Sequence, residues 1–303
     1  MQSSKIKIAP EGPEFSRTVA GLMNLARWEI SSSEALKWIE SCLELGVTTF
    51  DHADIYGQHR CEQLFGEAAN GQSSLRQKME LVTKCGIKTM SPARPAHRLN
   101  HYDTGKAHIL ASAENSLKML KTDYVDLLLI HRPDPLMNAD EVAEAFVELK
   151  QSGKVLYFGV SNFTTWQFDL LASRLDFPLV TNQIELSVLK MDSLHDGTAD
   201  LCQRLRISPM VWSPLAGGRL FESDSEQAVR VREALGNVAN EIGGVSIEQV
   251  ALAWLLSHPT KPLPVLGTGK IERIKEAIAA EQITLTREQW FTLWAASAGH
   301  RVP

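Results

Sequence analysis

The sequence has no apolar stretch long enough to cross a lipid bilayer, and its first residues, Met1 to Lys5, lack the apolar run of a signal peptide. We therefore expect no membrane partner and a cytoplasmic protein. An excess of positive charge is also absent, since 31 Lys and Arg face 36 Asp and Glu among 303 residues. Because phosphate binding requires a basic face, this balance argues against nucleic acid as a partner.

Cysteine is scarce and shows no pairing pattern. The four cysteines are Cys42, Cys61, Cys85 and Cys202. No two of them form a CxxC pair, so we expect reduced thiols and no disulfide framework. We also expect no metal site, because the spacing of His52, Asp54 and His59 matches no common zinc pattern.

Short apolar segments of strand length alternate with helical segments along the chain. The expected strands are Thr18–Leu25, Val47–Asp51, Glu80–Lys84, Val125–His131, Val155–Val160, Leu179–Glu185, Met210–Trp212 and Leu263–Leu266. The expected helices are Ser31–Leu45, Cys61–Ala69, Lys106–Leu120, Asp140–Gln151, Thr165–Ser173, Thr198–Leu205, helical stretches within Glu226–His258, Glu272–Ala280 and Thr286–Ala296. About eight such units without a break in composition favour one α/β domain over residues 1–303, a (β/α)₈ TIM barrel with additional helices near the C-terminus. An open parallel sheet is the alternative.

Polar residues stand at the end of nearly every expected strand. They are Asp51, Lys84, His131, Ser161, Asn162, Gln183, Ser213 and Thr268. In a (β/α)₈ barrel the carboxyl ends of the strands face the active-site mouth, so we expect these side chains around one pocket. A single residue of this kind is explained equally well as a helix cap or part of a solvated loop, and Ser213 and Thr268 fit that alternative most easily.

Four residues have the chemistry that carbonyl reduction requires. A carbonyl that accepts hydride becomes an alkoxide and needs a proton donor, which Tyr56 can be. The ammonium of Lys84 would lower the pKa of that tyrosine from roughly 10, and Asp51 is the natural partner of a lysine on an apolar strand. His131 can hydrogen-bond the substrate oxygen. Taken singly, each residue has a structural alternative: a packed tyrosine, an ion pair or a core histidine.

Seven motifs, in order along the chain, resemble those of the aldo-keto reductase family. They are Phe50–Gly57, Leu81–Gly86, Asp126–Arg132, Gly159–Phe163, Asn182–Glu185, Val211–Gly218 and Pro264–Lys270. The resemblance implies an NADP-dependent oxidoreductase that reduces an aldehyde or ketone to an alcohol by hydride transfer. It assigns the proton donor to Tyr56 and the remaining catalytic positions to Asp51, Lys84 and His131.

A Rossmann dinucleotide site is not expected, because no GxGxxG follows a strand. The resemblance implies instead that NADP(H) binds extended across the barrel mouth. Its nicotinamide contacts would be Ser161, Asn162, Gln183 and Trp212, and its pyrophosphate contacts Gly217, Gly218 and Arg219. Further implied cofactor contacts are Gly21, Met23, Asp51, Ser213, Pro214, Leu215, Gly267 and Gly269.

The preference for NADP over NAD depends on Thr268, Lys270 and Arg273. The resemblance assigns these residues to the 2′-phosphate of the adenosine. Two cations and a hydroxyl at a helix N-terminus form a suitable phosphate site. The alternative is that Lys270 and Arg273 are solvated helix charges.

The sequence departs from the family pattern at three positions. His52 replaces the usual threonine and is expected to alter the pocket floor. Trp212 is bulkier than the more common tyrosine or phenylalanine, and Ala277 replaces an adenine-contacting asparagine. We therefore expect adenine binding to differ from the family pattern.

The expected partner is a small-molecule carbonyl substrate. Its contacts are predicted to be Tyr56, His131, Met23 and Trp28, with Met90–Tyr102 as a further pocket wall. Core packing would explain Met23 and Trp28 as well. Two other functions stay open: a cofactor-binding regulatory subunit on the same fold, like the potassium-channel β subunits, and a barrel enzyme that acts on a phosphorylated metabolite without redox chemistry.

Overall fold

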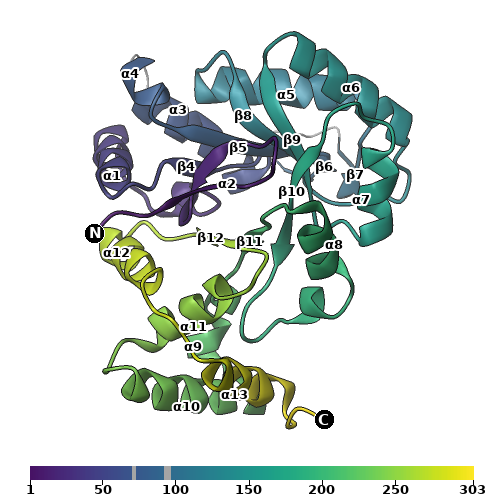
Figure 1. The fold of residues 1–303 in the computed structure, drawn as a ribbon. Helices are drawn as coiled ribbons and strands as arrows, with labels where there is room; N and C mark the ends of the chain where they lie inside the picture. The colour runs from purple at the N-terminus through teal and green to yellow at the C-terminus, as the bar shows by residue number, and fades with distance from the viewer. Residues whose placement is uncertain (70–72, 92–96) are drawn as a thin grey trace.

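Eight parallel strands close into a barrel, which confirms the predicted (β/α)₈ architecture (Figure 1). The computed structural model describes residues 1–69, 73–91 and 97–303. Around the barrel the strands are β3 (Val19–Gly21), β4 (Thr49–Asp51), β5 (Glu80–Cys85), β8 (Val125–Ile130), β9 (Val155–Ser161), β10 (Leu179–Glu185), β11 (Met210–Trp212) and β12 (Leu263–Leu266). Because order in the sequence and order around the barrel coincide, the carboxyl ends of these strands open at one mouth.

Helices pack around the outside of the barrel between successive strands (Figure 1). They are α1 (Ser32–Glu44), α3 (Cys61–Ala69), α5 (Lys106–Leu120), α6 (Ala139–Gln151), α7 (Thr165–Ala172), α8 (Thr198–Leu205), α11 (Ile247–Leu256) and α12 (Ile271–Ala280). Shorter helical segments are α2 (Tyr56–His59), α4 (Ser73–Arg76), α9 (Arg219–Glu222), η1 (Leu25–Arg27), η2 (Asp192–Leu194) and η3 (Ala216–Gly218). Within the part of the chain that the structure describes, no helix has the length and apolar character needed to cross a membrane.

Additional helices near the C-terminus are present, as predicted. The helices α10 (Glu226–Glu241) and α13 (Arg287–Ala298) lie side by side against the barrel's own helices (Figure 1). A second apolar cluster forms there, in which the rings of Trp254 and Trp290 stack with centroids 4.9 Å apart. Each indole N–H donates to the other residue's backbone carbonyl, at 3.2 and 3.0 Å. These bonds join α11 to α13.

Side-chain caps determine where several helices begin. Capping boxes join Ser31 to Glu34, Thr164 to Gln167, Ser246 to Gln249 and Thr286 to Gln289. Each satisfies backbone N–H groups that the first helical turn leaves without partners, and each cap contributes about 1 kcal/mol. The serine cluster before α1 therefore begins that helix, as its sequence predicts.

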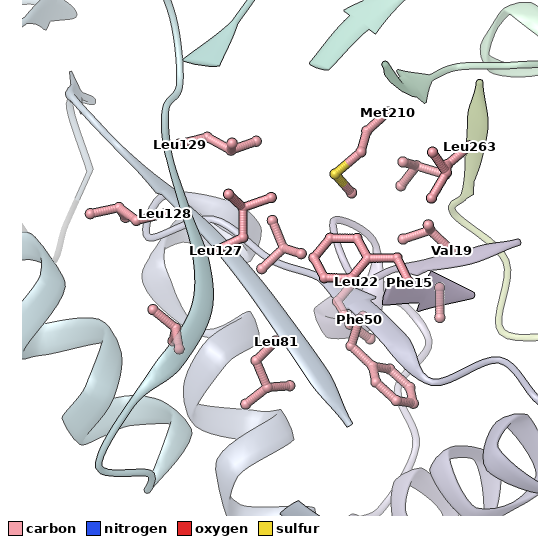
Figure 2. Packing of buried hydrophobic residues seen from close by; sticks show 14 of the residues in the cluster. Phe15, Val19, Leu22, Phe50, Leu81, Leu127, Leu128, Leu129, Met210 and Leu263 are labelled. Atoms are coloured by element: carbon pink, nitrogen blue, oxygen red, sulfur yellow. The ribbon is translucent and has the colours of Figure 1, made fainter. Parts of the chain in front are cut away.

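Apolar side chains of the barrel strands form one buried cluster, part of it inside the barrel and part beneath the surrounding helices (Figure 2). Phe15 is one of the residues of this cluster (Figure 2). It comes from an antiparallel hairpin of β1 (Lys5–Lys7) and β2 (Glu14–Ser16), and its side chain is fully buried. The N-terminal hairpin therefore contributes to the barrel core.

The first barrel strand is shorter than predicted. Instead of extending over Thr18–Leu25, it ends at Gly21, and the next amide, of Leu22, donates to the carbonyl of Asp51 at 2.9 Å. The chain then turns into η1, which leaves Met23 54% exposed. A second small hairpin, of β6 (Ile87–Lys88) and β7 (His101–Tyr102), follows β5 at the mouth.

Candidate active site

A buried lysine is the centre of the site. Lys84, on β5, is fully buried, and its ammonium donates to Asp51 Oδ2 at 2.7 Å, to the carbonyl of His52 at 2.7 Å and to the hydroxyl of Tyr56 at 3.1 Å. The other carboxylate oxygen, Asp51 Oδ1, accepts from Gln183 Nε2 at 2.8 Å. The structure therefore joins residues of β4, β5 and β10 in one hydrogen-bonded group.

His131 lies beside Tyr56 at the mouth. In the register of β5 and β8, Lys84 is level with Leu129, so alternation along the strand directs His131 to the same interior face. The rings of Tyr56 and His131 meet edge to face with centroids 5.8 Å apart. Within the described chain, the buried Nδ1 of His131 has no hydrogen-bond partner. The four predicted catalytic side chains are thus brought together.

Two opposite effects decide the protonation of the lysine and the tyrosine. Burial lowers the pKa of Lys84, but the charges of Asp51 and Tyr56 and their hydrogen bonds with the ammonium together outweigh it and raise that pKa above its ordinary value. Burial, together with the charge of Asp51, raises the pKa of Tyr56, and the charge and hydrogen bond of Lys84 offset this rise only in part. The sequence-based expectation of a lowered tyrosine pKa is therefore corrected: Lys84 acts in the expected direction, but burial prevails and Tyr56 stays protonated.

The histidine is neutral. Burial first, and then the nearby charges of Lys84 and Arg132, hold the pKa of His131 well below its ordinary value. A neutral imidazole beside a protonated phenol can bind an oxygen atom through hydrogen bonds without a competing imidazolium charge. The arrangement can therefore hold a substrate oxygen and transfer a proton to it from Tyr56.

The predicted nicotinamide residues form a hydrogen-bonded chain at the ends of β9, β10 and β11. Asn162 Nδ2 donates to Ser161 Oγ at 2.8 Å, and Ser161 Oγ donates to the carbonyl of Gln183 at 3.0 Å. Trp212 Nε1 donates to Asn162 Oδ1 at 3.1 Å. These bonds fix the orientation of the Asn162 amide and of the Trp212 indole ring, and the bond to Asp51 fixes that of the Gln183 amide.

The loop that follows β11 turns sharply. Ser213 and Ala216 have φ values of 51° and 55°, and Gly217 and Gly218 have φ values of 63° and 94°. Glycine tolerates this left-handed conformation without steric penalty, and the turn exposes Gly217 at the surface. Pro214 is buried and Leu215 half-buried at the base of the loop. The exposed backbone at Gly217 suits close approach of a pyrophosphate.

Arg219 lies directly after this loop, at the start of α9. Its side chain is exposed, and one guanidinium nitrogen is 3.5 Å from a carboxylate oxygen of Glu185. An exposed ion pair of this kind contributes little and exchanges readily for another anion. The arginine is therefore placed to neutralise a phosphate at the loop.

The segment Gly267–Arg273 leads into α12 and has the features of a phosphate site. Lys270 occupies the N-cap position without a side-chain cap, and its amide donates to Thr268 Oγ1 at 3.2 Å. Lys270 and Arg273 are exposed, and neither forms an ion pair with any described residue. Uncapped N–H groups and two unpaired cations fit a bound phosphate monoester.

Trp28 packs against the segment Gly267–Arg273. Its indole packs on Trp38 of α1, with centroids 4.9 Å apart, and a Cβ added to Gly269 would lie 2.8 Å from it. Asn24 Nδ2 donates to the carbonyl of Gly267 at 3.3 Å. Trp28, which the sequence suggested as a substrate contact, thus touches the predicted phosphate loop, and its role toward substrate stays a prediction.

The remaining predicted contacts differ in placement. Gly21 packs against β12, where an added Cβ would lie 2.9 Å from Val265 Cγ1, so glycine permits the close strand contact. Met23 is exposed and lies two residues beyond the end of β3. Of the expected pocket wall Met90–Tyr102, residues 92–96 lie outside the described chain.

Two of the departures from the family pattern point away from the mouth. His52 is fully buried and packs edge to face on Phe65 of α3 at 4.6 Å, so it lies on the helix side of β4 and not in the pocket floor. Neither of its ring nitrogens has a hydrogen-bond partner in the described chain. Ala277 lies on the buried face of α12, with 2% of its surface exposed.

Arg132 was not assigned a role from the sequence. It follows His131, and Nη1 donates to the carbonyl of His131 at 3.0 Å and to Ser161 Oγ at 3.3 Å. Its guanidinium lies 5.4 Å from the ring centroid of Trp212. The available signal was a cation directly after a histidine that ends a strand, which places its charge at the mouth.

Comparisons with known proteins show what the chain as a whole is similar to. Residues 18–297 match the family described as the aldo/keto reductase family. The chain is 54% identical over 299 residues to Oxidoreductase YdhF of Escherichia coli (strain K12), covering 99% of each, and 44% identical over 290 residues to 6-dehydroglucose reductase of Agrobacterium fabrum (strain C58 / ATCC 33970), covering 95% of this chain and 96% of that protein. The crystal structure of a thermostable aldo-keto reductase, Tm1743, in complex with the inhibitor epalrestat superposes with a TM-score of 0.81 at 27% identity, covering 97% of this chain and 99% of that one.

Proposed function

This chain belongs to the aldo/keto reductase family, and we propose that it is an NADPH-dependent reductase that converts an aldehyde or ketone into an alcohol. The family's enzymes are oxidoreductases that act on small carbonyl compounds with a nicotinamide cofactor. The observation that carries the proposal is the position of Lys84, whose ammonium bonds both Asp51 and the Tyr56 hydroxyl beside the His131 ring.

Each of the four residues has one task in the proposed reaction. The substrate oxygen accepts hydrogen bonds from Tyr56 and from the neutral imidazole of His131, which orient the carbonyl. NADPH, when bound, supplies a hydride to the carbonyl carbon. Tyr56 transfers its hydroxyl proton to the oxygen as negative charge develops there. The Lys84 ammonium, 3.1 Å from that hydroxyl, stabilises the phenolate that remains.

Asp51 keeps the lysine charged in a site where burial opposes the charge. Its carboxylate is 2.7 Å from the ammonium and is itself held by Gln183. Without this partner, burial would favour the neutral amine, which cannot stabilise a phenolate. Asp51 and Gln183 are therefore positioning residues in the mechanism.

The choice of NADPH over NADH is supported by the segment before α12. Thr268, Lys270 and Arg273 present a hydroxyl, two unpaired cations and an uncapped helix N-terminus. A 2′-phosphate would provide the negative charge that the two unpaired cations and the helix N-terminus can bind. Ser161, Asn162, Gln183 and Trp212 would hold the nicotinamide.

Carbonyl-dependent oxidation of NADPH tests the proposal. Purified protein would be mixed with NADPH and a panel of aldehydes and ketones, and loss of the reduced cofactor would be compared with formation of the alcohol. Sugar aldehydes belong in the panel because one relative is named 6-dehydroglucose reductase. Equal amounts of alcohol and oxidised cofactor are expected. Binding of NADPH without turnover of any carbonyl would contradict the proposal and favour the regulatory-subunit alternative.

A further inference from the structure

Arg132 extends across the barrel mouth. Arg132 follows β8 by two residues. Its guanidinium donates to Ser161 at the end of β9 and lies over the ring of Trp212 at the end of β11. This side chain therefore contacts residues at the ends of three barrel strands. Its guanidinium therefore lies over the opening and beside the residues that hold the substrate oxygen.

Most of the donors of this guanidinium are unused. Only Nη1 donates, to the carbonyl of His131 and to Ser161 Oγ, whereas Nε and Nη2 bond no described residue. A guanidinium has five N–H donors in a planar fork that matches the two oxygens of a carboxylate. Two donor-bearing nitrogens are thus free for a ligand at the mouth.

The charge of Arg132 has no counter-ion. No carboxylate of the described chain lies within ion-pair distance of it, and the nearby Glu185 is instead paired with Arg219 at 3.5 Å. The side chain is only partly exposed, and burial lowers the pKa of Arg132 from its ordinary value. A half-buried cation that lacks a partner is favourable when a ligand supplies the opposite charge.

We propose that Arg132 is a specificity-determining residue that binds a carboxylate on the substrate, so that the preferred substrates are aldehydes or ketones that also carry a carboxylate group. This inference rests on the proposed carbonyl reductase function. Tyr56 and His131 hold the carbonyl oxygen, and Arg132, which directly follows His131, holds the carboxylate through its free Nε and Nη2. A structural role for Arg132, in which it only links Ser161 to the backbone of His131, is the competing explanation.

Matched pairs of rigid aldehydes separate these explanations. The 2-, 3- and 4-carboxybenzaldehydes and their methyl esters present the same carbonyl with and without the charge, and the three isomers vary the distance between the groups. The value of kcat/KM would be measured for each with wild-type protein, with Arg132→Gln and with Arg132→Lys. Arg287→Gln, at an exposed position on α13, removes one positive charge away from the mouth and is the control.

A carboxylate preference that Arg132→Gln abolishes is the expected result. For at least one isomer, wild-type protein should prefer the acid to its ester, and Arg132→Gln should reduce that preference by about 10-fold or more, chiefly through KM. Arg132→Lys should restore it only in part, because an ammonium lacks the planar fork. Arg287→Gln should keep the wild-type preference.

Binding measured without turnover keeps this inference separable from the proposed function. Calorimetric titration of benzoate into the protein should give binding to wild-type that Arg132→Gln removes. Two results would overturn the carboxylate role while leaving carbonyl reduction intact. One is that wild-type protein turns over the esters without any preference for the acids, and the other is that Arg132→Gln lowers kcat/KM equally for acids and esters. Failure of every aldehyde together with Arg132-dependent benzoate binding would overturn the proposed function alone.

Discussion

Replacing Lys84 by methionine separates a catalytic ion pair from a structural one. Methionine keeps much of the length of the lysine stem but removes the ammonium, and with it the bonds to Asp51 and the Tyr56 hydroxyl. Asp51, 2% exposed, then retains Gln183 as the one hydrogen-bond donor to its carboxylate among the described residues. Breaking a buried ion pair in this way costs about 3–5 kcal/mol.

The double variant Lys84→Met with Asp51→Asn is the matched control. It leaves no uncompensated charge in the site, so we expect it to recover most of the stability lost in Lys84→Met. In thermal unfolding, Lys84→Met should melt roughly 5–10 °C lower than wild type, and the double variant close to wild type. Both should bind NADPH and neither should reduce carbonyls, because the phenolate of Tyr56 has lost its ammonium.

Activity decides between the two roles. If Lys84→Met melts earlier but keeps its turnover at a temperature where it is folded, the pair is structural and the mechanism is refuted. Recovery of both stability and turnover in the double variant would contradict it equally. A folded, cofactor-binding and inactive double variant is the outcome that the mechanism requires.

Two further predictions concern the cofactor and acid stability. Lys270→Ala combined with Arg273→Ala should weaken NADPH binding by tens-fold or more and NADH binding little, because each charge-assisted phosphate contact contributes about 1.5–3 kcal/mol; equal losses in fluorescence titrations would mean that these residues do not bind the 2′-phosphate. Burial, and then the Lys84 charge, lower the pKa of His52 from 6.5 to about 3, so the folded protein holds this imidazole neutral. The contribution of the neutral ring to the free energy of unfolding is present above pH 6.5 and is lost as the pH falls toward 3. Urea unfolding should therefore show that wild type loses about 2 kcal/mol more than His52→Phe between pH 7 and pH 5, and an equal loss in both proteins would show that His52 is not the acid-sensitive group.

The barrel was predictable because its strands are unambiguous in sequence. Val125–Ile130 is apolar at nearly every position, as burial on both faces requires, and the observed strand ends one residue before the predicted boundary. The hairpin of β1 and β2 was not predicted, because three-residue strands such as Lys5–Lys7 have too little periodicity to be recognised. Its contribution to the core, through Phe15, depends on tertiary packing.

The positions of the candidate site residues were predictable, but their environments were not. Asp51, Lys84 and His131 all lie within one residue of the carboxyl end of a barrel strand, so the topology alone brings them to one mouth. The net direction of the Tyr56 pKa depends on how deeply the ring is buried, which spacing does not reveal. The unpaired charge of Arg132 and the packing of Trp28 under Gly269 likewise depend on side-chain placement.

Turnover of Tyr56→Phe tests the proposed mechanism most directly. The substitution deletes the hydroxyl that Lys84 bonds at 3.1 Å and keeps the ring that packs against His131. Loss of the general acid should lower kcat by about 10²–10⁴-fold while NADPH affinity and melting temperature stay close to those of wild type. A folded Tyr56→Phe protein that keeps more than half of the wild-type kcat would contradict the assignment of Tyr56 as the proton donor.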